Sequence, residues 1–270
     1  MPPHPFQQTI RKRIRRIRKR ADALSRVCAH RGLHALRIEL KRFRAMLRLL
    51  RHIDPEFPYS DVNQPFKDLF DQAGQLRFWQ LQTRLLRETP DVPALFADRY
   101  RVYARKRLRH AREVFRASVR HENLPRWRDV KNVFRSSLKR CEAPALEDYF
   151  ETARAAAAAI AGRLDRTRSA ERHELRKILK DYALNRQLVS KHFGYDPPAV
   201  PGLPADASLL DAPFGSWHDV QAAGVQLAYD LQTQAWEKEA LEGGGVVLRA
   251  WKKQEKALWR RVRPLLKKIR

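Results

Sequence analysis

Cysteine, acidic side chains and long apolar segments are all scarce in this 270-residue sequence. The two cysteines, Cys28 and Cys141, form no C-x-x-C pair and no cluster with histidine, which excludes a disulfide framework or zinc finger and indicates a reducing compartment. The longest apolar run, 155–161, is far shorter than the roughly 18 residues of a membrane helix. No hydrophobic segment follows the basic residues of 11–20, so we expect no secretory signal and a cytoplasmic protein.

Acidic side chains are far fewer than basic ones. The 56 Lys and Arg residues outnumber the 30 Asp and Glu residues, which gives a net charge of +26. So large an excess attracts polyanions at long range, and nucleic acid, polyphosphate, phosphorylated small molecules and anionic lipid are all admissible partners. The acidic residues are dispersed, and the sequence has no Walker loop, no G-x-S-x-G and no H-E-x-x-H. We therefore expect no enzymatic activity, no cofactor and no metal site.

Apolar residues recur at helical spacing along nearly the whole chain, and no period-two pattern is sustained. The fold class predicted is therefore all-α. The clearest helix is 32–52, and 9–28 has an apolar stripe that predicts a helix docked on the core with solvated arginines. The other expected helices are 64–89, 92–120, 124–140, 145–168, 171–193, 209–241 and 246–268, with Gly243, Gly244 and Gly245 separating the last two.

A phrase of the form His-x-Leu-Arg-x-x-Leu-Lys occurs twice, at 34–41 and at 173–180. A second pattern follows each copy in register: Gly74-x-x-Arg77-x-x-Gln80 begins 40 residues after the first histidine, and Gly215-x-x-His218-x-x-Gln221 begins 42 residues after the second. The repetition indicates an internal duplication. We predict two tandem helical bundles, with repeat halves 1–140 and 141–270, inside one domain that spans 1–270.

The repeated phrase places basic residues beside a buried seam. In 32–52 the basic positions repeat the leucine spacing shifted by one residue, so at about 100° per residue they flank the seam and suit the wall of a groove. Glu39 is the only carboxylate between His34 and Arg51. That scarcity, and the recurrence of the pattern, favour anion binding over a merely solvated face. Since a bound phosphate favours the imidazolium form, we expect the two leading histidines to bind an anion more strongly below about pH 6.5.

The doubled His-x-x-Arg-x-x-x-Lys helix with its later Gly motif resembles the CHAD family, whose name refers to conserved histidines on α-helices. The resemblance spans essentially the whole chain. It implies two four-helix bundles related by pseudo-twofold symmetry and a basic central surface that binds inorganic polyphosphate. Some members are fused to a triphosphate-tunnel enzyme domain, for which these 270 residues leave no room, so a stand-alone member is expected. Ala183 and Phe78 depart from the family's pattern and favour the first half as the stronger binder.

We therefore predict a non-enzymatic protein that binds inorganic polyphosphate and localises to polyphosphate granules. The predicted binding residues are His34, Arg37, Lys41, Arg44, Arg48, His173, Arg176, Lys177 and Lys180. Further contributions are expected from Arg15, Arg77, His218, Lys252 and Lys256. Two alternatives stay open: a sequence-independent nucleic-acid binder, with nucleic acid otherwise only a competitor, and an enzyme acting on phosphoanhydrides. Chain-length preference and oligomeric state do not follow from the sequence.

Overall fold

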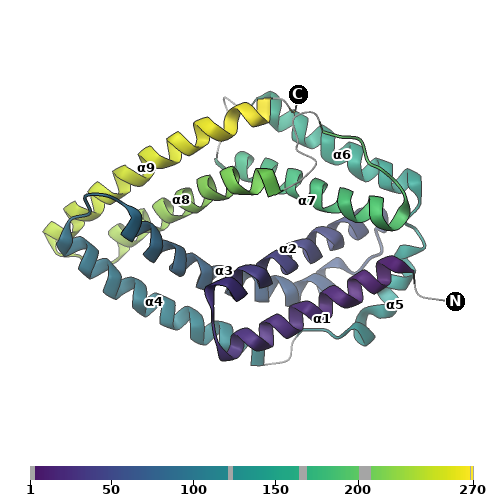
Figure 1. Cartoon of the computed structure of the whole chain (residues 1–270), viewed down its shortest axis with the longest axis horizontal. Helices are drawn as coiled ribbons and strands as arrows, with labels where there is room; N and C mark the ends of the chain where they lie inside the picture. The colour runs from purple at the N-terminus through teal and green to yellow at the C-terminus, as the bar shows by residue number, and fades with distance from the viewer. Residues whose placement is uncertain (1–3, 121–123, 164–168, 201–207, 268, 270) are drawn as a thin grey trace.

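The computed structural model describes residues 4–120, 124–163, 169–200, 208–267 and 269 (Figure 1). Within these ranges all regular secondary structure is α-helical, which confirms the all-α prediction. The helices are α1 (Pro5–Arg26), α2 (His30–Ile53), α3 (Tyr59–Glu88), α4 (Ala94–Arg120), α5 (Trp127–Leu138), α6 (Ala143–Gly162), α7 (Ser169–Phe193), α8 (Ser208–Thr233) and α9 (Lys238–Lys267).

The predicted break at Gly243–Gly245 is wrong, because these glycines lie inside α9 and the chain leaves the helix at 234–237 instead. Their role is close packing. A Cβ at Gly243 would lie 2.8 Å from the Cβ of Phe96, and a Cβ at Gly244 would collide with Leu231 and lie 3.0 Å from the ring of Phe96. The glycines thus allow α9 to approach α4 and α8, at the cost of helix propensity.

The helices pack as a closed group and two pairs. Helices α1, α2, α3 and α4 contact one another in cyclic order, while α6 packs on α7 and α8 packs on α9. The α6–α7 pair then contacts α2, and the α8–α9 pair contacts α3 and α4. In Figure 1, α7 and α8 follow one another along one side of the centre, and α2 and α3 lie along the other.

The apolar interior consists of two clusters that both cross the predicted boundary at 140/141. The cluster centred on α1–α5 includes Val220 and Trp251 from α8 and α9, and the cluster centred on α6 and α7 includes Leu49 and Ile53 from α2. Each half therefore completes the core of the other. The division into two symmetric four-helix bundles stays a prediction.

The amphipathic character of α2 is confirmed. Its predicted seam is wholly buried, at Leu33, Leu36, Leu40, Phe43, Leu47 and Leu50. Arg37, Lys41, Arg44 and Arg48 are half-buried beside that seam, as the one-residue offset requires. On α1 likewise Ile10, Ile14 and Ile17 are buried, whereas most of its basic side chains are exposed. None of the helices in the described ranges combines the length and apolarity needed to cross a bilayer.

Candidate anion-binding surface

Helices α2, α3, α7 and α8 bring basic side chains together around His218 and Asp219 of α8. Burial, together with the charges of Arg176 on α7 and Lys41 on α2, lowers the pKa of His218 to about 3. His34 responds in the same way, with a pKa lowered by burial, by Arg77 of α3 and also by Lys180 of α7. We call this the central basic surface and define it by Arg37, Lys41, Arg44, Arg77, His173, Arg176, Lys180 and His218.

Arg37 is the most constrained cation of the surface. Its Nη1 donates a hydrogen bond of 2.8 Å to the carbonyl oxygen of Phe70, and its guanidinium lies 4.2 Å from the centre of the Phe70 ring. Burial, reinforced by the nearby Arg77, lowers the pKa of Arg37 to about 10. A Cβ at Gly74 would lie 2.8 Å from Arg37 Nη1. The glycine of the first Gly-x-x-Arg motif therefore provides the space in which Arg37 lies against α3.

The second copy of that motif works differently. A Cβ at Gly215 would meet no atom within 4 Å, so this glycine provides no space for an arginine. Its motif instead anchors a histidine, because His173 Nε2 donates a 2.7 Å hydrogen bond to Gln221 Oε1, and Gln221 Nε2 donates to Ser169 Oγ. His173 also lies 4.6 Å from the ring of His218, centre to centre. The second histidine is thus held by α8.

The first half has no such anchor. His34 is exposed, and Gln80 has a buried Oε1 without a hydrogen-bond partner among the described residues. The two copies of the repeat therefore present different groups: a buried arginine in the first half, and a hydrogen-bonded histidine in the second. Stronger binding by the first half stays a prediction.

The buried nitrogen atoms of the surface without a hydrogen-bond partner within the described part of the chain include Nη1 of Arg77 and Nδ1 of His218. Buried polar atoms are nearly always hydrogen-bonded, so such atoms are the natural contacts of an incoming acceptor. Arg44 contacts both Phe70 and Asn63. Its guanidinium lies 5.0 Å from the centre of the Phe70 ring, and its Nε donates a hydrogen bond of 3.3 Å to Asn63 Oδ1. Arg77 and Arg44 both have pKa values lowered first by burial.

Asp219 supplies a negative charge within this surface. Burial raises the pKa of its carboxyl, whereas the charges of Arg77 and Arg176 oppose that rise. The carboxylate in turn partly offsets the repulsion between Arg37 and Arg77. No role for Asp219 was predicted from the sequence. Arg84 was not predicted either; its charge acts on Asp219, and it follows Arg77 by seven residues on the same face of α3.

Arg48 has a partner within the protein. Its Nε and Nη2 contact the two carboxylate oxygens of Asp181 at 2.5 and 2.7 Å. This bidentate pair joins α2 to α7, so the structure gives Arg48 a cross-linking contact, and direct binding of a ligand by Arg48 stays a prediction. Lys177 is exposed and pairs with Glu174 on its own helix at 3.1 Å.

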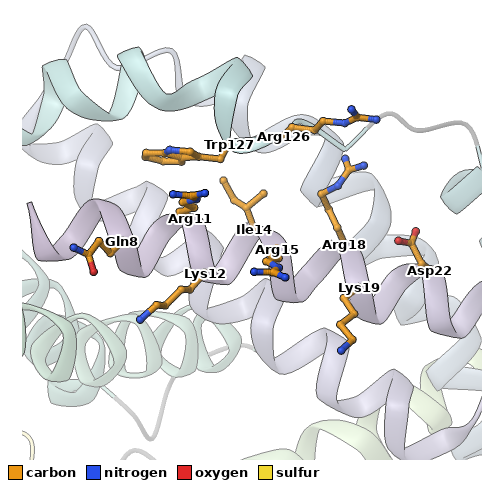
Figure 2. Close-up of a pocket in the computed structure, with 10 residues that line it drawn as sticks. All are labelled: Gln8, Arg11, Lys12, Ile14, Arg15, Arg18, Lys19, Asp22, Arg126 and Trp127. Atoms are coloured by element: carbon orange, nitrogen blue, oxygen red, sulfur yellow. The ribbon is translucent and has the colours of Figure 1, made fainter. Parts of the chain in front are cut away.

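The three remaining predicted residues lie apart from these interactions. Arg15 is exposed in a different groove, between α1 and the chain that enters α5 (Figure 2). Lys252 and Lys256 are exposed on α9, and the α9 side chain whose charge acts on His173 is Glu255. Binding by these lysines stays a prediction.

The described residues contain no cluster of three or more His, Cys, Asp or Glu side chains suited to a metal ion. Cys28 and Cys141 are free, half-buried thiols. Burial raises the pKa of Cys141 to about 12, so its thiol is protonated at neutral pH and is a poor nucleophile. The surface thus holds mainly basic groups, with carboxylates such as Asp219 and Asp71 close enough to act on them, a composition suited to binding anions.

The structure is thus an all-α domain that gathers basic side chains from four helices. The family model described as CHAD domain matches residues 8–228, and the chain belongs to this family. The match includes the whole central basic surface and ends within α8, before Lys252 and Lys256. A search of curated proteins found no match.

Proposed function

We propose that the protein binds inorganic polyphosphate on the central basic surface and that it is not an enzyme. The observation that carries the proposal is the convergence of cations from α2, α3 and α7 around His218 and Asp219 of α8. Membership of the CHAD family, which is associated with polyphosphate binding, supports the same ligand.

The spacing of the cations suits a chain of phosphates better than a single phosphate. Residues three or four apart on a helix are about 5–6 Å from one another, so Arg37, Lys41 and Arg44 form a row along α2. Arg176 and Lys180 repeat the spacing on α7. An extended polyanion can contact both rows at once, and Arg77 Nη1 and His218 Nδ1 offer buried donor positions between them, the histidine once it is protonated.

The central basic surface also suits a polyanion that has no nucleobases. The Phe70 ring is covered by the guanidinium groups of Arg37 and Arg44, so it is not available to stack on a nucleobase. Polyphosphate needs only charge and hydrogen-bond donors. This distinction favours polyphosphate over nucleic acid at this surface.

Catalysis on a phosphoanhydride requires stabilisation of charge on the transferred phosphoryl group, which enzymes of this class achieve with Mg²⁺ held by side-chain oxygens. Asp219 is a carboxylate of this surface whose neighbours Arg77 and Arg176 are cations rather than further oxygen ligands, and the described residues form no cluster suited to a metal ion. We therefore propose binding without turnover. Release of phosphate from long-chain polyphosphate by the purified protein would contradict this part of the proposal.

The test is a polyphosphate titration of a triple variant, Arg37→Ala, Lys41→Ala and Arg44→Ala. We expect affinity to fall at least about tenfold, since each charged contact contributes roughly 1 kcal/mol or more. Binding by the unmodified protein should weaken steeply with salt, as for other condensed polyanions. Polyphosphate should displace DNA or RNA from this surface at equal phosphate concentration, and the triple variant should lose association with polyphosphate granules in cells.

A further inference from the structure

A second basic groove lies between α1 and the chain that enters α5, and the proposed function makes no use of it (Figure 2). The groove has a volume of about 840 Å³. Its α1 side carries five cations, Arg11, Lys12, Arg15, Arg18 and Lys19. At about 1.5 Å per residue they extend over roughly 12 Å of the helix, at spacings that place them on one face.

Among the described residues that line this groove, Asp22 is the one carboxylate and six are Lys or Arg, so positive charge is in excess. Within the described part of the chain, no carboxylate forms an ion pair with Arg11, Lys12, Arg15 or Lys19. By contrast Arg13, on the inward side of the same helix, pairs with Glu39 at 2.8 Å. Arg18 joins α1 to the chain that precedes α5, because one of its side-chain nitrogens donates to the carbonyl oxygen of Leu124. Arg11, Lys12, Arg15 and Lys19 are exposed to solvent.

The groove contains the half-buried ring of Trp127, whereas the half-buried Phe70 of the central basic surface lies beneath the guanidinium groups of Arg37 and Arg44. One side of Trp127 stacks on Phe134, with ring centres 5.9 Å apart and an interplanar angle of 20°. Figure 2 shows the indole over the groove near Arg11 and above the buried Ile14. An indole supported from behind and flanked by guanidinium groups is the arrangement used by proteins that bind single-stranded nucleic acid.

We propose that the α1–α5 groove binds single-stranded nucleic acid, with a base stacked on Trp127 and the adjoining phosphates on Arg11, Lys12, Arg15 and Lys19. Inorganic polyphosphate would use the cations but leave the indole without a partner. The groove and the central basic surface therefore serve different polyanions, and a chain bound to polyphosphate retains a separate contact for a nucleic-acid strand.

The proposal is tested by binding a fluorescein-labelled oligo(dT) and a labelled polyphosphate to three variants of equal charge change. The groove variant is Arg11→Gln, Arg15→Gln, Lys19→Gln. The central variant is Arg37→Gln, Lys41→Gln, Arg44→Gln. The control is Arg105→Gln, Arg109→Gln, Arg112→Gln, which removes three exposed cations from α4.

We expect the groove variant to lose at least about tenfold in oligo(dT) affinity and less than about twofold in polyphosphate affinity. The control should lose less than about threefold for either ligand. Equal loss of oligo(dT) affinity in the groove and control variants would overturn the proposal, as would a loss found only in the central variant. Polyphosphate affinity of the central variant tests the proposed function, and oligo(dT) affinity of the groove variant tests the present proposal. Either proposal can therefore be refuted while the other stands.

The role of the indole is tested with an abasic strand of the same length and charge. The unmodified protein should bind the abasic strand at least about fivefold more weakly than oligo(dT), a comparison that needs no variant. Trp127→Phe should preserve most of this preference and the packing on Phe134, whereas Trp127→Leu should abolish the preference. Equal affinity of the unmodified protein for oligo(dT) and the abasic strand would overturn the proposal, because it would show that the groove binds by charge alone.

Discussion

Gly74→Ala is the substitution that separates the role of Arg37 from the general basicity of the chain. A methyl group at this position would lie 2.8 Å from Arg37 Nη1, so the end of the Arg37 side chain must shift, and we expect the guanidinium to leave its place against α3. It then loses the hydrogen bond to the Phe70 carbonyl and the contact with the Phe70 ring. These interactions are worth about 1.5–3 and 0.5–1 kcal/mol respectively.

Two gains oppose that loss. Alanine is favoured over glycine inside a helix by about 1 kcal/mol, and the displaced guanidinium regains hydration that burial had removed. We therefore expect Gly74→Ala to lower the free energy of unfolding by about 1 kcal/mol, measured by urea denaturation. Polyphosphate affinity, measured by fluorescence polarisation, should fall about threefold to tenfold because Arg37 no longer occupies its position on the central basic surface.

The chain offers a matched control in Gly215→Ala, where the added methyl group meets no atom within 4 Å. This variant should be more stable than the unmodified protein by up to about 1 kcal/mol and should bind polyphosphate normally. In an Arg37→Ala background, Gly74→Ala should become stabilising as well and should no longer alter binding. The reasoning is refuted if Gly74→Ala and Gly215→Ala have the same effect on stability and binding.

Three further predictions concern the helix contacts and the buried histidine. Arg48→Ala and Asp181→Ala should each destabilise the fold, and a double-mutant cycle should give a coupling free energy of about 1–3 kcal/mol. If the effects of the two substitutions on the free energy of unfolding were additive, the Arg48–Asp181 pair would not contribute to stability. Gly244→Ala should destabilise by about 1–3 kcal/mol in urea denaturation despite the better helix propensity, and a stabilised protein would contradict the close packing of α9. The pKa of His218 in the folded protein lies below its unfolded value of about 6.5, so the unfolded chain binds more protons and stability falls as the pH drops through that value. The loss should reach about 2 kcal/mol at pH 5, disappear in His218→Gln, and be smaller with polyphosphate bound.

The sequence predicted those features that depend on helical periodicity. The apolar seam of α2 and the basic stripe beside it lie where the spacing of Leu36, Leu40, Arg37 and Lys41 places them, because side-chain direction along a helix follows from position alone. The docked α1, with its buried isoleucines and exposed cations, follows for the same reason.

Contacts between residues far apart in the sequence could not be predicted from helical periodicity. Asp181 is 133 positions from Arg48, and no local pattern pairs them. Gly243 and Gly244 indicate a helix break by propensity, and only the proximity of Phe96 from α4 explains why they stay helical. The Gly-x-x-Arg motif was recognised, but its purpose depends on where the side chain of Arg37 lies on α3.

The central claim is that polyphosphate binds the central basic surface rather than the basic chain as a whole. The most direct measurement compares polyphosphate dissociation constants, at moderate salt, of the Arg37→Ala, Lys41→Ala, Arg44→Ala variant and the corresponding α4 variant at Arg105, Arg109 and Arg112. We predict a loss of at least about tenfold in the first and less than about twofold in the second. Equal affinities in the two variants would contradict the account.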